Sequence, residues 1–225
     1  MKKTTYQQIE NYMLSCMKDS AHDREHIYRV LYLALDIAST EPETDYDVLI
    51  CACLLHDIGR QAQFENPAVS HAEAGAAQAL RFLCDQQFSK EFAIKVCDCI
   101  RSHRFRKQNP PQSLEAKILF DADKIDVSGA TGIARTLIYE GHVKEPLYSL
   151  LEDGSVSDGT SDTKPSFFHE YKYKLEHIYE HFYTKRGAEI AGQRRQAAAD
   201  FYQALYHEVT SSYEGGRKNL EQHVK

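Results

Sequence analysis

Histidines and aspartates that interrupt apolar stretches are the residues of this chain best suited to chemistry. His56 and Asp57 stand at the end of the apolar run in LICACLLHDIGRQ, where seven of the eight residues from Leu49 to His56 are apolar. A buried ionised carboxylate needs a hydrogen-bonded partner, an opposite charge or a metal ion. A second His-Asp dipeptide, His22–Asp23, lies in a polar turn, where its carboxylate needs no buried partner. The partner of Asp57 must therefore come from elsewhere in the sequence.

Two other segments direct ionisable side chains toward apolar faces. His26 lies at the start of the apolar face of DREHIYRVLYLALDIA. In LEAKILFDADKIDV, Asp123 lies within an apolar stripe at three- and four-residue spacing, whereas Asp121 points to a different side and Asp126 flanks the stripe. Two histidines and two aspartates from three helices, all directed inward, suit a divalent metal ion. The ligand set favours Mn²⁺, Fe²⁺, Co²⁺, Ni²⁺ or Zn²⁺ over calcium and does not choose among them.

The elements that must position these residues are helices, and the predicted fold class is all-α. Apolar periodicity predicts helices over residues 23–38, 46–57, 71–83, 89–105 and 114–127, and two long C-terminal helices over 166–184 and 187–212. The last dozen residues are expected to fray. Residues 152–165, EDGSVSDGTSDTKP, have no periodicity and predict a mobile loop that could cover a site.

Composition limits the class of protein. The chain has 225 residues, 42% of them apolar, which is enough for one domain with a sizeable core. Its net charge of −6 argues against an electrostatic grip on nucleic acid or an anionic membrane. Neither a membrane-spanning run nor a secretion signal is recognisable, so we expect a cytoplasmic protein with reduced cysteines. The two C-x-C pairs, Cys51/Cys53 and Cys97/Cys99, lie in apolar runs and predict core packing, with a zinc site as the alternative.

The order H…HD…D resembles the HD-domain superfamily of metal-dependent phosphohydrolases. The motifs are DREHIYRV, LLHDIGR and DADKID, followed by GATGIAR, within roughly residues 20–135. The chain looks most similar to small stand-alone bacterial HD-domain nucleotide pyrophosphohydrolases. The resemblance implies an HD-domain helical bundle with two long C-terminal helices packed on it. Residues 1–140 would form the metal-binding catalytic core, 141–165 a loop or lid, and 166–225 the helices that complete the same domain.

The resemblance also implies a ligand set. Carried over position by position, the metal ligands would be His26, His56, Asp57 and Asp123. Asp121 is the competing choice for the last ligand. Asp123 is preferred because the family's aspartate usually precedes a basic residue, here Lys124, and because of its place on the apolar stripe.

His71 and His103 occupy the places where two-metal members of the superfamily carry extra histidines. They predict either a second metal site or contacts with phosphate. HDIGR is close to the HDIGK of cyclic-dinucleotide phosphodiesterases, but the paired histidines of that group are missing. The acidic pair that follows HD in alarmone hydrolases is also absent, because Arg60–Gln61 stand there.

Such a site would hydrolyse a phosphate ester or anhydride. A bound cation lowers the pKa of a coordinated water and, with nearby basic groups, offsets charge on phosphoryl oxygens. We expect catalytic roles for Asp57, Lys124 and Asp126, the last by orienting water or substrate. Expected substrate contacts come from Arg29, Arg60, His71, His103 and Lys124. The predicted substrate is a small phosphorylated metabolite, most simply a nucleotide, with pyrophosphate release from a triphosphate favoured and monophosphate hydrolysis next.

Two alternatives remain open at the level of sequence. A di-iron HD-type oxygenase would use His71 and His103 as extra ligands. A nucleotide-binding regulatory module would keep the site without turnover, although modules of that kind tend to lose ligands. The cationic cluster in TKRGAEIAGQRRQ suits a solvated face, a polyphosphate contact or a dimer contact, and leaves a homodimer open.

Overall fold

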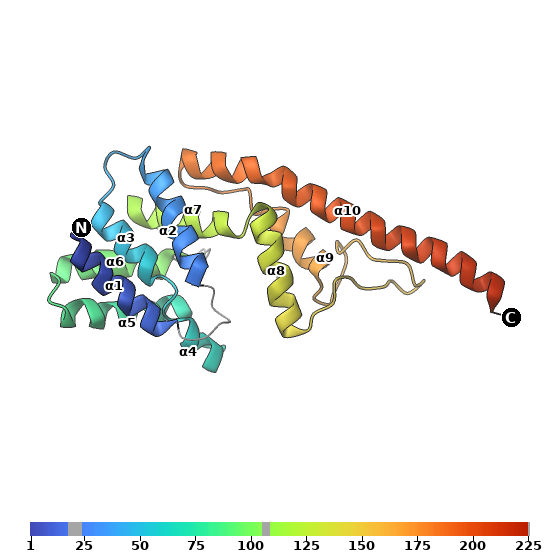
Figure 1. Cartoon of the computed structure of the whole chain (residues 1–225), viewed down its shortest axis with the longest axis horizontal. Helices are drawn as coiled ribbons and strands as arrows, with labels where there is room; N and C mark the ends of the chain where they lie inside the picture. Colours follow the sequence, from blue (N-terminus) through green and yellow to red (C-terminus); the bar gives the residue numbers. More distant parts are fainter. Residues whose placement is uncertain (18–23, 105–108, 225) are drawn as a thin grey trace. The chain divides into compact units, whose positions relative to one another are not determined.

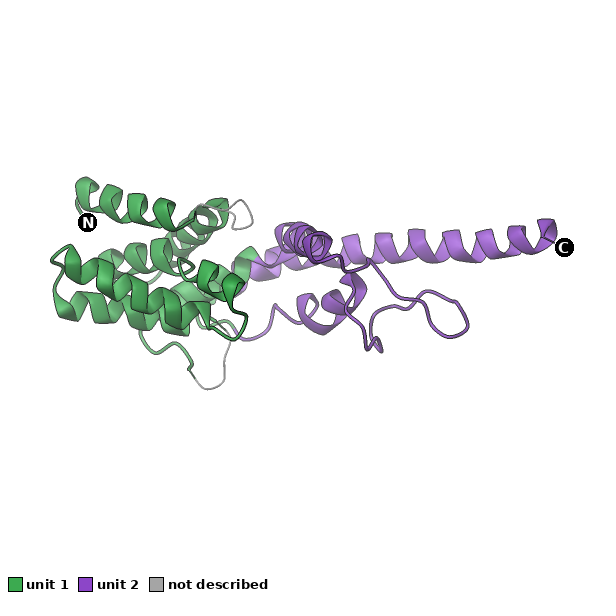
Figure 2. Cartoon of the chain, turned by 90° about the horizontal axis from the view of Figure 1, so that it is seen from below, with its two compact units in different colours: residues 1–126, 182–187 green, residues 127–181, 188–225 purple. Residues whose placement is uncertain are grey.

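The chain folds into helices that form two compact units. The computed structural model describes residues 1–17, 24–104 and 109–224 and has no named strand within them, which confirms the all-α prediction (Figure 1). Unit 1 comprises Met1–Asp126 with Phe182–Gly187, and unit 2 comprises Val127–His181 with Ala188–Lys225 (Figure 2). Residues 22, 23 and 105, which belong to features predicted above, lie outside the described residues.

Unit 1 is built around one helix that is apolar on every side. The helices of this unit are α1 (Lys3–Cys16), α2 (Arg24–Ala38), α3 (Tyr46–Leu55), α4 (Arg60–Glu65), α5 (His71–Asp85), α6 (Lys90–Ser102) and α7 (Leu114–Asp126). Helix α3 contacts α1, α2, α5, α6 and α7. Asp45 fixes its start by accepting hydrogen bonds from the N–H groups of Asp47 and Val48. The central helix therefore ends at His56–Asp57 inside the unit.

The two C-x-C pairs are part of this core. Cys51, Cys53, Cys97 and Cys99 are buried free thiols on α3 and α6. Burial raises the pKa of Cys97 to about 11 and that of Cys99 to about 12. Among the described residues, no cysteine belongs to a group able to hold a metal ion. The core-packing prediction is confirmed.

Unit 2 departs from the predicted helices. It contains α8 (Gly129–Val143), the short α9 (Phe167–Glu170), one π-helical turn η1 (Tyr171–Leu175), and α10 (Lys185–His223) from Ala188 onward. The predicted helix over 166–184 is wrong, because turns follow η1 and His181 adopts the left-handed backbone conformation (φ 61°). Tyr171 instead stacks on Tyr202 with ring centroids 4.1 Å apart.

The predicted frayed C-terminus is also wrong. Helix α10 continues to His223 (Figure 1). Arg217 donates a hydrogen bond to the carbonyl oxygen of Asp153 at 2.9 Å, which fastens this part of the helix to the loop of the same unit. In that loop, the Asp162 carboxylate accepts hydrogen bonds from the hydroxyl groups of Ser149 and Ser157. Residues 152–165 thus have fixed hydrogen-bond partners within unit 2.

No helix in the described part of the chain combines the length and apolarity needed to cross a membrane.

Glu140 of α8 gives unit 2 a pH-dependent stability. Its side chain is 3% exposed, and neither carboxyl oxygen has a hydrogen-bond partner among the described residues. Burial, reinforced by the charges of Glu145 and Glu170, raises its pKa from 4.5 to about 7. Between these values the folded state binds more protons than the unfolded state. The free energy of unfolding therefore falls as pH rises from 4.5 to about 7, and Glu140 lowers it no further at higher pH.

We expect Glu140→Gln to remove this loss. The Tm of the variant should rise relative to that of the parent between about pH 5 and about pH 8, because glutamine has no proton to release. Thermal unfolding followed by circular dichroism at both pH values measures the difference. Glu152→Gln, at an exposed position of the same unit, is the matched control. An equal Tm difference at the two pH values would contradict the prediction.

Candidate metal centre

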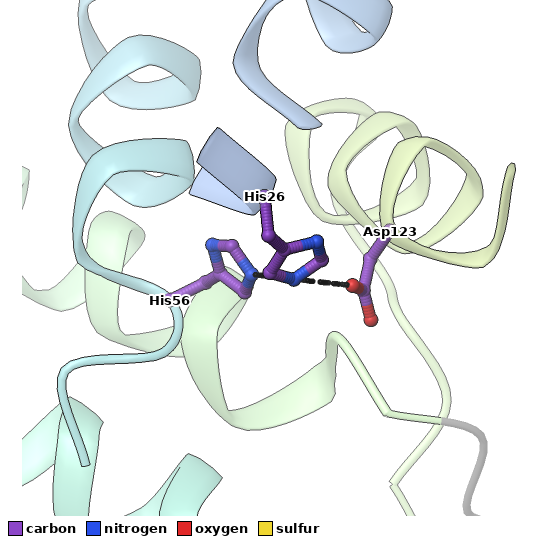
Figure 3. Close-up of side chains that lie close together, drawn as sticks. All are labelled: His26, His56 and Asp123. Carbon is purple, nitrogen blue, oxygen red and sulfur yellow. Dashed lines mark hydrogen bonds and ion pairs between the residues drawn. The ribbon is translucent and has the colours of Figure 1, made fainter. Parts of the chain in front are cut away.

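Three side chains from different parts of unit 1, two on helices and one just after a helix, converge on one point (Figure 3). His26 comes from α2, His56 follows α3, and Asp123 comes from α7. His26 Nε2 lies 3.3 Å from Asp123 Oδ1 and 3.4 Å from His56 Nε2, and His56 Nε2 lies 4.0 Å from Asp123 Oδ1. We call these residues the first group, and they could together hold a metal ion.

A second group lies beside the first and consists of Asp57, His71 and His103. His71 Nε2 lies 3.4 Å from Asp57 Oδ1 and 3.3 Å from His103 Nε2, and His103 Nε2 lies 3.7 Å from Asp57 Oδ1. The other oxygen of Asp57, Oδ2, lies 3.6 Å from His26 Nε2 and 3.8 Å from His56 Nε2. One carboxylate thus faces both groups.

Two of the imidazoles are oriented by the ends of their own helices. His56 Nδ1 donates to the carbonyl oxygen of Cys53 at 2.8 Å, and His103 Nδ1 donates to that of Ile100 at 2.6 Å. A backbone carbonyl can only accept, so each ring carries its proton on Nδ1. Each Nε2 therefore presents a lone pair to the centre. Burial lowers the pKa of His56 to about 4, which keeps this ring neutral.

The other two imidazoles are oriented by side chains. His26 Nδ1 donates to Asp126 Oδ2 at 2.7 Å, and Arg29 holds that carboxylate through Nε at 2.7 Å and Nη2 at 3.1 Å. His71 Nδ1 donates to Gln63 Oε1 at 2.7 Å. Burial lowers the pKa of His71 to about 3, so this ring is neutral as well. All four rings turn Nε2 toward the two groups.

The electrostatics of the centre favour a cation. Burial alone would lower the pKa of His26, but hydrogen bonds with Asp123, Asp126 and Asp57 raise it to about 10. The carboxylates thus strongly prefer a positive charge at this position. Asp57 Oδ1 is buried without a hydrogen-bond partner among the described residues, and an unpaired buried carboxylate oxygen is costly.

These residues fit a divalent metal ion. Two ligands held at about 2.1 Å from one ion in tetrahedral geometry lie about 3.4 Å apart. The closest ligand separations are 3.3 Å and 3.4 Å in the first group and 3.3 Å and 3.4 Å in the second. The mixture of imidazole nitrogen and carboxylate oxygen is that of transition-metal sites. An ion would also give Asp57 Oδ1 the partner that it lacks within the described part of the chain.

Gly59 brings the second group together. A Cβ atom at this position would lie 2.2 Å from the carbonyl oxygen of His71 and 2.4 Å from the backbone nitrogen of Gly75. Only glycine permits so close an approach of the turn after Asp57 to α5. The glycine of HDIG therefore places His71 beside the carboxylate.

The two aspartates considered for the last ligand have different surroundings. Asp123 belongs to the first group. Asp121 accepts hydrogen bonds from the backbone N–H groups of Tyr183 and Thr184 and from the Thr184 hydroxyl, at 2.6 to 3.1 Å. Thr184 Oγ1 in turn accepts from the N–H of Gly187 and caps α10. Asp121 thus holds the segment 182–187 within unit 1.

The other predicted site residues have these contacts. Arg60 Nε donates to Asp57 Oδ2 at 2.9 Å. Lys124 lies over the rings of Phe182 and Phe120, 4.7 Å and 5.8 Å from their centroids. Asp126 is buried and faces His26, which gives it the position of an orienting residue where the sequence predicted a contact with water or substrate.

Sequence reasoning missed the groups that hold the imidazoles from behind. The carbonyls of Cys53 and Ile100 stand three residues before their histidines at helix ends, and this spacing was a usable signal. Gln63 lies in RQAQFENPAVS, whose polar composition predicts a connecting segment. In the structure its first six residues form α4. Nothing in the sequence marks that glutamine.

Comparison with known proteins agrees with this geometry. A family model for the HD domain matches residues 24–128. A crystal structure from an uncultured Thermotogales bacterium, described as a predicted HD superfamily hydrolase, is 32% identical and covers 90% of this chain and 91% of that chain, with a TM-score of 0.61. The Bacillus subtilis protein YpgQ is 26% identical over 209 residues, which cover 90% of this chain and 93% of YpgQ.

The crystal structure of YpgQ in complex with ADP is similar over 91% of this chain and 97% of that chain, with 25% identity and a TM-score of 0.70. Three observations agree: the 32% identity over nine-tenths of the Thermotogales protein, the family match, and the convergent histidines and aspartates. The chain belongs to the HD-domain family of metal-dependent phosphohydrolases.

Proposed function

We propose that this protein hydrolyses a nucleotide in the cytoplasm, with a nucleoside triphosphate as substrate and pyrophosphate as product. The observation that carries the phosphohydrolase part is the convergence of four imidazole Nε2 atoms with the carboxylates of Asp57 and Asp123 in two adjoining groups. Within them, Asp57 Oδ1 has no hydrogen-bond partner among the described residues. The complex of YpgQ with ADP supports a nucleotide as the ligand class. Pyrophosphate release is the reaction that the family resemblance favours.

Metal would be held first by His26, His56, Asp57 and Asp123. When bound, a divalent ion there would supply Lewis-acid polarisation of a phosphoryl oxygen and would lower the pKa of a coordinated water toward neutral pH. His56 contributes a neutral ring with its lone pair already directed inward. Mn²⁺, Fe²⁺, Co²⁺, Ni²⁺ and Zn²⁺ all suit these ligands.

The remaining residues of the chain hold these ligands and supply charge. Asp126 fixes the ring of His26, and Arg29 compensates the charge of Asp126. Arg29 and Arg60 are 35% and 33% exposed, and Asp123 is 23% exposed, whereas His56 and His71 are fully buried. The centre is therefore open to solvent near Asp123. Positive charge at this rim would attract and orient a polyphosphate.

Product analysis tests the proposal. Protein stripped with chelator is reloaded with Mn²⁺, Co²⁺ or Ni²⁺ and incubated with nucleoside tri-, di- and monophosphates. We expect release of pyrophosphate from triphosphates with metal and none from the stripped protein. Phosphate released from monophosphates would instead identify a nucleotidase.

The second group supports one other candidate function. Six nitrogen and oxygen ligands also suit two iron ions, as a di-iron oxygenase requires. Iron-loaded protein that consumes oxygen with an organic substrate and hydrolyses no nucleotide would favour this alternative. Tight nucleotide binding with metal present and no turnover would instead contradict both enzymatic functions and favour a regulatory module.

A further inference from the structure

The four histidines of the centre differ in what holds them from behind. Three are fixed by groups that cannot reverse their polarity. The acceptors of His56 and His103 are backbone carbonyls, and the acceptor of His26 is the buried carboxylate of Asp126. His71 alone among them depends on a side-chain amide, that of Gln63.

An amide has an acceptor on one side and a donor on the other. In the orientation observed, Gln63 Oε1 accepts from His71 Nδ1 at 2.7 Å. The proton is therefore on Nδ1, and Nε2 turns its lone pair toward Asp57 Oδ1 at 3.4 Å and His103 Nε2 at 3.3 Å. With the amide reversed, its NH₂ would need a lone pair on Nδ1. The ring proton would then move to Nε2, where it blocks a metal ligand.

We propose that Gln63 is the positioning residue that fixes the tautomer of His71 and thereby makes Asp57, His71 and His103 a second metal site. This inference rests on the proposed function, because that function supplies the first metal ion. With Nε2 unprotonated on His71 and His103, the buried Asp57 Oδ1 faces two nitrogen lone pairs and has no hydrogen-bond donor among the described residues. A cation is the partner that all three atoms can share.

The fold supports this role for Gln63. Its backbone N–H bonds to the carbonyl of Gly59 at 3.4 Å, so the amide stands one helical turn after the glycine that touches α5. Helices α4 and α5 contact each other. Both the histidine and its acceptor are thus placed by one close approach of the chain. Residues that orient metal-binding histidines in this way change metal affinity about 10- to 100-fold when they are replaced.

Cobalt titration of the stripped protein tests the proposal without reference to turnover. We expect the parent to bind two equivalents of Co²⁺, and Gln63→Leu to keep the first while the second binds about 10- to 100-fold more weakly. Gln63→Glu, which retains an acceptor, should restore the second. Gln61→Leu is the matched control, because Gln61 is exposed on the same short helix and bonds to Glu65.

Nitrogen-15 NMR of the metal-free proteins adds a direct reading of the tautomer. His71 should be an Nδ1–H tautomer in the parent and in Gln63→Glu, and should populate the Nε2–H tautomer in Gln63→Leu. Two equally tight Co²⁺ sites in Gln63→Leu would overturn the proposal. A parent that hydrolyses nucleotides with a single Co²⁺ would overturn it and leave the proposed function intact. If Gln63→Leu loses only the second site and the parent hydrolyses no nucleotide, the result would support this proposal while the proposed function fails.

Discussion

Asp57→Asn is expected to abolish metal binding at both groups and to reduce nucleotide hydrolysis by about 10³-fold or more. One oxygen of Asp57 faces His26 and His56, and the other faces His71 and His103. Burial alone would raise the pKa of this carboxyl, but the charge of Arg60 and the neighbouring imidazoles outweigh burial and hold the pKa well below its usual value. Asparagine keeps the shape and removes the charge that a cation needs. Metal ions contribute several kcal/mol of transition-state stabilisation, which corresponds to the expected loss.

Elemental analysis of Mn²⁺-reloaded protein and product release measure the two effects. Asp98→Asn on α6 is the matched control, since Asp98 is 64% exposed and pairs with Arg101. Circular dichroism establishes that both variants remain folded. Retention of metal by Asp57→Asn, or hydrolysis within tenfold of the parent, would contradict the prediction.

The core of the site was predictable because it depends on helical periodicity. His26, His56 and Asp123 each interrupt an apolar stripe, and burial of a polar group on such a stripe requires a partner. Asp121 and Asp123 are two residues apart and so point to different sides of α7, which separates their roles. The composition of α3 likewise predicted a central helix.

Other features depend on contacts between segments that are distant in sequence. Periodicity alone predicts a continuous helix over residues 166–184. The observed chain departs from it, because Tyr171 stacks on Tyr202, 31 residues later, and His181 adopts the left-handed conformation. The orienting role of Asp126 needs α2 and α7 to pack, so that its carboxylate meets His26 and Arg29. Gln63 has no periodic signal because α4 is six residues long. Such roles follow from packing and not from local pattern.

Opposite effects are expected from the two neighbouring aspartates of α7. Asp123→Asn should lose the first metal ion and about 10³-fold of hydrolysis, because it removes the anionic ligand beside His26 and His56. Its fold should persist. Asp121→Asn should keep the metal ion, because both oxygens of Asp121 are bonded to Tyr183 and Thr184.

The cost of Asp121→Asn should appear in stability. Burial raises the pKa of Asp121, and the hydrogen bonds from Thr184 and Tyr183 oppose that shift by stabilising the charged form. Asparagine offers these donors one neutral acceptor, so we expect the free energy of unfolding to fall by about 2–4 kcal/mol. Urea unfolding and Mn²⁺ content, measured on both variants, separate the two roles. Asp121→Asn that binds no metal while folded, or Asp123→Asn that binds metal as the parent does, would reverse the assignment of the ligand. Because the two positions share a helix and a substitution, each variant is the control for the other.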